Sequence, residues 1–194
     1  ESASPFFLKQ EWQTRNKVVE DQTSDEPDSL IVLVQDDQTF YDFKSEVETR
    51  SPNNKVVVRL KWGFAFADLG DDTYELNPSG EADYRLLQEA LQLKGIDVST
   101  IVHLWSMNDG LSTVLEKTLK LGVHSVFNGI RMLLDQKSNV KKKFIFAVTG
   151  IPENILPQYS AVASMLRAIN LENHNFIARY LMVDDKKLLP RLIL

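Results

Sequence analysis

The stretch Ile101–Ser106, Ile-Val-His-Leu-Trp-Ser, is an almost continuous apolar run between polar flanks. Such a run is typical of a strand that is covered on both faces, as in a parallel sheet between layers of helices. The sequence therefore predicts a central buried strand here, within an α/β fold. The polar residues 106–110 would then lie at the sheet edge where open α/β sheets bind their ligands.

Apolar runs alternate with segments of helical periodicity along the rest of the chain. Further strands are expected at residues 30–34, 55–60, 73–76, 143–149 and 176–183, with an edge strand in 5–12. Helices are expected after Asp37 (Phe40, Phe43 and Val47), at 81–93, 111–136 and 156–171, and as a short helix at 185–194. Loops are expected at 16–29 and 62–66. This alternation predicts a mostly parallel sheet with right-handed crossovers, in a Rossmann-like three-layer sandwich.

The segment 111–136 is the longest one with helical spacing. Its predicted apolar stripe consists of Leu111, Val114, Leu115, Leu119, Val126, Phe127, Ile130, Leu133 and Leu134. Gly122 falls on this stripe, where a missing side chain would allow close contact between helix and sheet. Gly95 is expected to end the helix at 81–93, because glycine readily adopts positive φ.

Composition indicates one well-buried domain that comprises residues 1–194. The net charge of −5 argues against a nucleic-acid partner and against an anionic membrane surface. The chain has no cysteine, which excludes disulfides and thiolate metal sites and fits a reducing compartment. It also has no apolar run of about 20 residues and no signal-peptide pattern, so a cytoplasmic location is expected.

The motifs of common α/β enzymes are absent from the sequence. None of its eight glycines is two residues from another, so the phosphate-cradling G-x-G-x-x-G fingerprint cannot occur. None of its five tyrosines has a lysine four residues later, as a short-chain reductase needs. A nucleophile elbow, a Walker loop and an H-E-x-x-H motif are missing too. We therefore assign no catalytic residue, no cofactor-binding residue and no metal ligand.

The three histidines have structural interpretations. His103 alternates with apolar residues in the predicted central strand and is expected to be packed and hydrogen-bonded. His124 lies within the long helical segment and His174 in the turn before the last strand. The wide spacing between the three gives no local metal-binding pattern.

The tryptophans and a lysine cluster are assigned in the same way. Trp12, Trp62 and Trp105 are expected to anchor the core or an interface, since no basic cluster surrounds them. Lys141–Lys143 is expected to be the solvated entry to a strand and not a phosphate-binding patch.

One alternative is a receiver domain of a two-component system. Asp36 and Asp37 follow the first apolar strand, Asp109 follows a later one, and Thr149 and Lys186 come further on. In a receiver, an acidic pair holds Mg²⁺ beside a phosphoacceptor aspartate. The long separation of Asp37 from Asp109, with an additional strand between them, argues against this alternative.

A resemblance to a known family covers nearly the whole chain. It rests on these segments in this order: Phe6–Trp12, Trp62-Gly63-Phe64, Tyr74–Pro78, Asp83–Leu87, Ile101–Ser106, Tyr159–Leu171, Glu172-Asn173-His174 and Tyr180–Asp184. The chain resembles the N-terminal, structural subdomain of a modular polyketide synthase ketoreductase. Its sequence is similar in character to the sequences of synthases whose acyltransferase acts in trans.

The resemblance implies a specific division of labour. A complete ketoreductase has two Rossmann-like halves, of which the second binds NADPH and carries the catalytic residues. The first half is a truncated short-chain-reductase-like fold that lacks the cofactor site and supports the second half. The resemblance thus implies a part of a multifunctional enzyme for secondary metabolites such as antibiotics, with the acyl carrier protein as an indirect partner. Thr149-Gly150 departs from the usual Thr-Arg-Gly of the family.

Two functional classes remain open from the sequence. The chain could support a reductase half, or it could be a pseudo-ketoreductase that braces a neighbouring methyltransferase or dehydratase domain; an independent enzyme ranks behind both. A catalytic half would begin after Leu194, with a glycine-rich strand. The apolar ends Phe6-Phe7-Leu8 and Leu188–Leu194 are expected to form a seam with the neighbouring domain or, alternatively, to complete the core of this domain.

Overall fold

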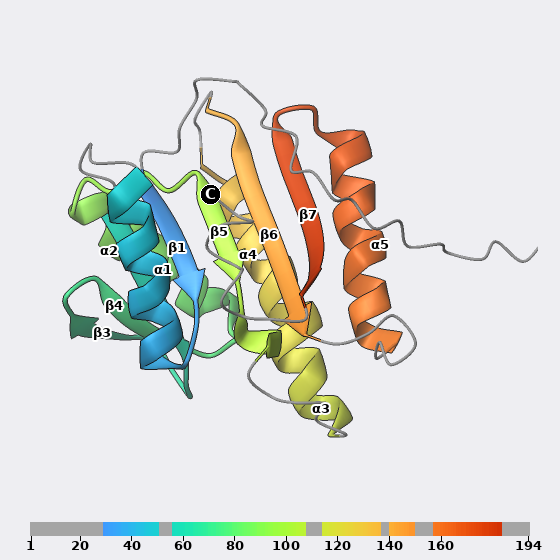
Figure 1. Cartoon of the computed structure of the whole chain (residues 1–194), viewed down its shortest axis with the longest axis horizontal. Helices are drawn as coiled ribbons and strands as arrows, with labels where there is room; N and C mark the ends of the chain where they lie inside the picture. The colour runs from blue at the N-terminus through green and yellow to red at the C-terminus, as the bar shows by residue number, and fades with distance from the viewer. Residues whose placement is uncertain (1–28, 51–55, 108–113, 137–139, 150–156, 184–194) are drawn as a thin grey trace, which may run out of the picture.

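The computed structural model describes residues 29–50, 56–107, 114–136, 140–149 and 157–183. Seven strands form one sheet in the order β3-β4-β2-β1-β5-β6-β7 (Figure 1). The strands are β1 (Ser29–Leu33), β2 (Val56–Trp62), β3 (Ala67–Gly70), β4 (Thr73–Leu76), β5 (Thr100–His103), β6 (Lys142–Thr149) and β7 (Phe176–Val183). The helices are α1 (Asp37–Arg50), α2 (Glu81–Leu93), α3 (Leu115–Thr118), α4 (Ser125–Leu134) and α5 (Pro157–Glu172).

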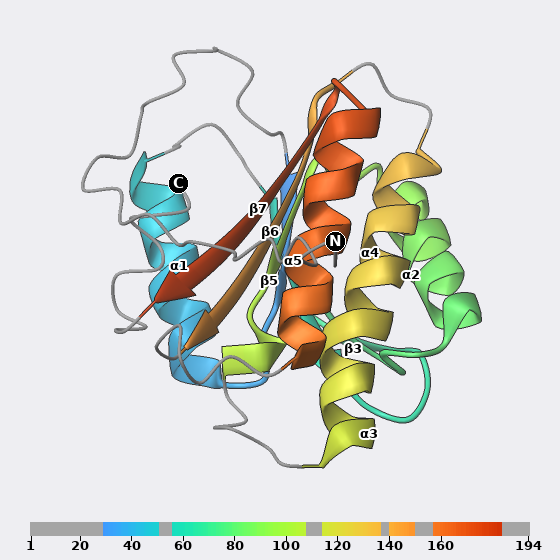
Figure 2. The same cartoon turned by 90° about the vertical axis from the view of Figure 1, so that its right-hand side faces the viewer.

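All strand pairs are parallel except β3–β4. β1 lies at the centre, where Ile31 is in register with Val58 of β2 and with Ile101 of β5. The helices lie on both faces: α1 covers one face, and α2, α4 and α5 cover the other (Figure 2). The predicted Rossmann-like fold with a mostly parallel sheet is thereby confirmed.

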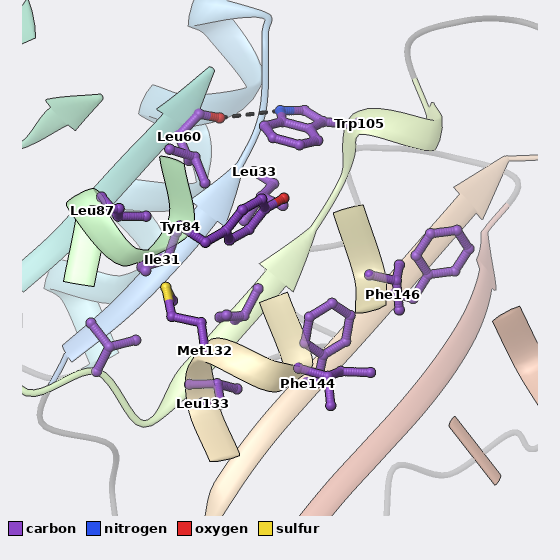
Figure 3. Packing of buried hydrophobic residues seen from close by; sticks show 14 of the residues in the cluster. Ile31, Leu33, Leu60, Tyr84, Leu87, Trp105, Met132, Leu133, Phe144 and Phe146 are labelled. Atoms are coloured by element: carbon purple, nitrogen blue, oxygen red, sulfur yellow. Dashed lines mark hydrogen bonds between the residues drawn. The ribbon is translucent and has the colours of Figure 1, made fainter. Parts of the chain in front are cut away.

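The core consists of two apolar clusters, one on each face of the sheet. Side chains of a strand alternate between the faces, so Ile31 and Leu33 join the cluster under α2, α4 and α5, which Figure 3 shows in part. Leu30 and Val32 join the cluster under α1. All five residues of β1 are buried, which explains why this strand has no polar alternation.

Several predicted elements match the structure closely. α2 and β7 have the predicted bounds, and Gly95 follows α2 with φ of +70°. Phe40, Phe43 and Val47 are buried on one side of α1, as their spacing predicts.

The predicted strand at Ile101–Ser106 is too long. β5 ends at His103, and Trp105–Met107 form a short 3₁₀ turn. The backbone N–H of Leu104 still donates to the carbonyl of Leu33 at 2.9 Å, and the N–H of Met107 then bends back to the carbonyl of Leu104 at 3.0 Å. Trp105 remains buried, so apolar periodicity could not distinguish the turn from a continued strand.

The prediction of a loop at residues 62–66, directly after the strand at 55–60, is partly wrong. β2 continues to Trp62, and residues 67–70 form the edge strand β3 that pairs antiparallel with β4. The turn between them uses positive φ at Gly70, Asp71 and Asp72. β3 has no buried residue, so its sequence lacks the apolar signal on which strand prediction depends.

The helix predicted at 111–136 is not continuous. In the described residues it consists of α3, a π turn at Leu119–His124 and α4. Val126, Ile130 and Leu133 are buried as predicted, whereas four residues of the predicted stripe are exposed: Val114, Leu115, Phe127 and Leu134. Leu119 is only half-buried.

The close contact predicted for Gly122 has a different partner. A Cβ at Gly122 would lie 3.0 Å from the Tyr159 ring, so this glycine brings the π turn close to α5 and not to the sheet. Gly129 makes the contact between helix and sheet instead, because a Cβ there would lie 3.0 Å from the Phe144 ring of β6.

Lys142 corrects the prediction of a fully solvated lysine cluster. Its side chain is buried, and its ammonium donates to the carbonyl of Val98 at 3.0 Å and to Oε1 of Gln136 at 2.8 Å. Asp97 lies 3.6 Å away and supplies an opposite charge. Lys142 therefore joins three separate segments at the start of β6.

Some predictions fall outside the described residues. These are the edge strand in 5–12, the loop at 16–28, Leu111, the helix at 185–194 and both apolar ends. Ser29 belongs to β1 and is buried, so it is not the end of an exposed loop. Within the described part, no helix is both long and apolar enough to cross a membrane.

Candidate functional site at the carboxyl edge of the sheet

The turn between β1 and α1 occupies a position of known importance. In dinucleotide-binding Rossmann folds, the first strand-to-helix turn holds the pyrophosphate with backbone N–H groups at the start of the helix. Here the turn is Gln35-Asp36-Asp37, without a glycine. Oδ2 of Asp36 accepts the backbone N–H of Thr39 at 2.6 Å, so an aspartate side chain caps this helix start.

Asp37 is paired with two basic side chains of β2. Its Oδ1 lies 2.6 Å from Nη1 of Arg59 and 3.4 Å from Nζ of Lys61. The hydrogen bond and the charge of Arg59, followed by the charge of Lys61, hold the pKa of Asp37 below its usual value. The carboxylate thus stays charged and linked to β2 at neutral pH.

Arg59 connects β2 to the turn by its other donors as well. Its guanidinium donates to the carbonyl of Gln35 at 2.8 Å and to that of Val34 at 3.4 Å. Its carbon Cζ lies 5.1 Å from the centre of the Phe40 ring. Although Arg59 is only 4% exposed, its charge has a carboxylate, two carbonyls and an aromatic face as partners.

Neighbouring hydrogen bonds hold the rest of this edge. Oε1 of Gln35 accepts the backbone N–H of Trp62 at 3.1 Å. The carbonyl of Leu60 accepts the N–H of Val34 at 3.0 Å and the indole N–H of Trp105 at 3.1 Å (Figure 3). Trp105 therefore spans from the end of β5 to β2, across β1.

The arrangement at this turn stabilises the fold by pairing its polar groups with one another. Two carboxylates, one capping α1 and one paired with Arg59, lie where a cofactor-binding relative would present N–H groups. The N–H of Thr39 is already bonded to Asp36, and the turn has no glycine that would let a phosphate approach the backbone closely.

His103 has a structural environment, as predicted. It is fully buried, with Nε2 2.7 Å from Oγ of Ser125. Oγ of Ser125 donates its own hydrogen to the carbonyl of Leu121 at 2.7 Å, so His103 must donate through Nε2–H. The rings of Phe146 and Trp105 lie 5.0 and 5.5 Å away. Burial lowers the pKa of His103 to about 3, and the imidazole is neutral.

The other two histidines lie on the surface, in an environment unlike that of His103. His124 is exposed, with Nδ1 3.0 Å from Oγ of Ser79, and His174 is exposed in the turn before β7. Of the receiver-like set, Asp109 and Lys186 lie outside the described residues. Across the residues that the structure describes, no group of three or more histidines, aspartates and glutamates could hold a metal ion.

A shallow apolar groove of about 310 Å³ lies beside this edge. It is lined by residues that follow β2 and β4 and by residues of α3 and the π turn, including Trp62, Phe64, Pro78 and Leu121. Phe64 is 95% exposed, and Nζ of Lys117 lies 5.8 Å from the centre of a Trp62 ring. Trp62 is half-buried, and it lines this groove.

Sequence reasoning missed Arg59, which organises the turn. The available signal was a charged residue within the apolar run 56–60, together with an acidic pair after the preceding strand. Because neighbouring parallel strands end at the same sheet edge, such a pair and such a cation lie close together.

Comparisons with known proteins identify the family. The model of the family described as "Beta-ketoacyl synthase-like, N-terminal" matches residues 28–193. The chain belongs to this family. No curated protein sequence matches it.

Solved structures show the same fold. An N-terminal ketoreductase from a macrolactin assembly line has a TM-score of 0.69 at 20% identity, over 88% of this chain and 37% of that one. A keto acid-selecting NRPS module with adenylation, ketoreductase and pseudo Asub parts has a TM-score of 0.67 at 19% identity, over 82% and 14%. A short-chain dehydrogenase/reductase variant from Serratia marcescens has 0.56 at 9% identity, over 84% and 85%.

The chain therefore spans 37% of the length of the macrolactin ketoreductase protein and 14% of that of the NRPS module. Two proteins that contain a ketoreductase thus share the fold of this chain, in agreement with the predicted resemblance to a ketoreductase.

Proposed function

We propose that this chain is the non-catalytic structural half of a polyketide synthase ketoreductase and that it stabilises the NADPH-binding half. The catalytic half would reduce β-ketoacyl groups on the acyl carrier protein, which would contact this chain only indirectly. Family membership and the shared fold support the proposal. The cysteine-free composition fits the cytoplasmic location that we propose for the assembly.

The observation that carries the proposal is the turn between β1 and α1. It keeps the topology of a phosphate-binding turn, but Asp36 caps the helix start and Asp37 pairs with Arg59. A pyrophosphate brought to this turn would meet two carboxylates. A half that keeps the sheet and helices without this chemistry suits a supporting role.

A pseudo-ketoreductase that braces another domain is the alternative. It makes the same demands on this chain, because both roles act through contacts with a neighbouring domain. One of the similar structures combines a ketoreductase with a pseudo Asub part in one NRPS module. The two roles differ in which neighbour depends on the chain.

The test is to express the synthase region around this chain with and without residues 1–194. We expect removal to lower the melting temperature and the NADPH-dependent reduction by the adjacent reductase half. Loss of a methyltransferase or dehydratase activity, with reduction unaffected, would favour the bracing role. If every neighbouring domain is equally stable and active without the chain, both roles are wrong.

Point variants sharpen this experiment, because deletion is a large perturbation. Phe127 on α4 is 55% exposed and Tyr41 on α1 is 62% exposed, and these helices cover opposite faces of the sheet (Figure 2). We expect Phe127→Asp or Tyr41→Asp, whichever lies in the contact, to weaken the neighbour without unfolding this chain. The other variant then serves as the matched control. If neither variant affects any neighbour, contact through these two helix faces is excluded.

A further inference from the structure

The helix that follows β5 contains a wide turn that its sequence does not predict. Between α3 and α4, residues Leu119–His124 form a π turn, and the backbone N–H of Ser125 donates to the carbonyl of Lys120, five residues earlier, and to that of Gly122, three residues earlier. In a regular α-helix this N–H would donate to the carbonyl of Leu121. π turns within helices are uncommon and often occur at functional positions.

The sequence also supports a regular helix through this region. Leu115, Leu119, Gly122 and Val126 are separated by four, three and four residues, so a regular helix would place all of them on one face. In the structure Gly122 and Val126 are buried, whereas Leu119 is half-buried and Leu115 is 60% exposed. The wide turn thus rotates α3 and moves two leucines away from the apolar stripe.

Two buried polar side chains lie at the end of the wide turn. Oγ of Ser125 is within donating distance of the carbonyls of Leu121, at 2.7 Å, and of Gly122, at 3.2 Å, and the first of these is the carbonyl that the N–H of Ser125 would bind in a regular helix. His103 of β5 donates through Nε2 to Oγ of Ser125 at 2.7 Å and fixes this hydroxyl. Both residues are fully buried, so solvent does not compete for these bonds.

We propose that residues 115–124 form an element with two registers. The contact between His103 and Ser125 maintains the π turn, and its loss lets the segment convert to a regular helix that returns Leu115 and Leu119 to the stripe. A buried hydrogen bond at the end of β5 thereby controls how much apolar surface α3 exposes beside the groove lined by Trp62 and Phe64. This inference rests on the fold and is independent of the proposed function.

The absence of cysteine makes the register measurable by thiol labelling. Leu115→Cys is introduced into the 194-residue chain, and its reaction rate with a maleimide is compared with and without Ser125→Ala. We expect Ser125→Ala to slow the labelling about tenfold, because the thiol moves from the surface to the stripe. Simple destabilisation would have the opposite effect, since partial unfolding exposes buried thiols and speeds their reaction.

Two controls separate the register change from other effects. Phe127→Cys, at a position 55% exposed on α4 beyond the turn, should react equally fast with and without Ser125→Ala. Ser164→Ala removes a comparable bond, from Oγ to the carbonyl of Ser160 at 3.1 Å on α5, and should leave Leu115→Cys labelling unchanged. Ser125→Thr keeps the hydroxyl and should label like the original chain.

A second variant keeps the test decisive if Ser125→Ala does not fold. His103→Phe suits the aromatic surroundings and removes the donor to Ser125, so it should slow Leu115→Cys labelling in the same direction. Circular dichroism establishes that each variant is folded. Unchanged or faster labelling of Leu115→Cys in the folded variants would overturn the proposal.

Discussion

Arg59 and His103 are buried basic side chains at the same edge of the sheet, but Arg59 is charged and His103 is neutral. Arg59 is 4% exposed and lies 2.6 Å from the carboxylate of Asp37, with two carbonyls as further acceptors. His103 is fully buried and has one hydroxyl and three aromatic rings around it. Burial leaves the His103 imidazole neutral, whereas a guanidinium keeps its charge in proteins and can be buried at Arg59 because a carboxylate and two carbonyls accept its hydrogen bonds.

The largest effect is expected on the aromatic side of this comparison. Trp105 is 1% exposed and donates its indole N–H to the carbonyl of Leu60 at 3.1 Å. Trp105→Ala should lower the free energy of unfolding by about 3–5 kcal/mol, because it leaves a cavity and removes one of the two N–H donors to the Leu60 carbonyl. Urea denaturation measures this loss of unfolding free energy. Trp62→Ala, at a half-buried position, is the control and should have a smaller effect. A loss below about 1 kcal/mol would show that Trp105 does not anchor the core.

A smaller effect is expected on the charged side. Arg59→Met keeps the apolar stem but removes the donors to Gln35 and Asp37, and should cost about 1.5–3 kcal/mol of unfolding free energy. Lys61→Met is the matched control, because Lys61 contacts the same carboxylate from 3.4 Å in a more exposed position. In an Asp37→Asn background the cost of Arg59→Met should shrink, and an unchanged cost would mean that the pair is not coupled.

We expect His103 to make the free energy of unfolding depend on pH. Its pKa falls from an ordinary 6.5 to about 3 on folding, so between these values the unfolded chain binds a proton that the folded chain does not. The contribution of neutral His103 to the free energy of unfolding is therefore fully present above pH 6.5. It decreases as the pH falls, by at most about 1.4 kcal/mol per pH unit. Denaturation midpoints recorded between pH 7 and pH 5 measure this loss of stability. His103→Phe should remove this part of the slope; if the slope persists, other groups cause it.

The smallest expected effect is that of NADPH. Because Asp36 and Asp37 occupy the turn after β1, millimolar NADPH should leave the melting temperature of the chain unchanged. Differential scanning fluorimetry measures it, with inorganic phosphate at the same ionic strength as the control. A rise with NADPH alone would contradict the supporting role that we propose.

The sequence predicted those parts of the fold in which burial follows a simple period. α2, β7 and the fully buried β1 belong to this group, as does the turn at Gly95, where positive φ favours glycine. The edge strand β3 could not be predicted in this way, since its pairing with β4 is a backbone property that leaves its side chains exposed.

The candidate site was harder to predict because its contacts join distant residues. The neutral, hydrogen-bonded state of His103 follows from its apolar neighbours in sequence, but its partner Ser125 is 22 residues away. Arg59 and Asp37 are also distant in sequence, and only the pairing of β1 with β2 brings them together. The π turn runs against the local periodicity, and the hydrogen bond between His103 and Ser125 at its end joins residues that are distant in sequence.

The hairpin of β3 and β4 has a consequence for association between copies of the chain. An exposed sheet edge is a template on which another strand can add. Here the edge strand β3 has four residues and a register shift between Asp68 and Gly70, and Nζ of Lys94, directly after α2, lies 3.4 Å from the Asp68 carboxylate. Shortness, irregularity and charge make this side of the sheet a poor surface for growth into strand-paired aggregates.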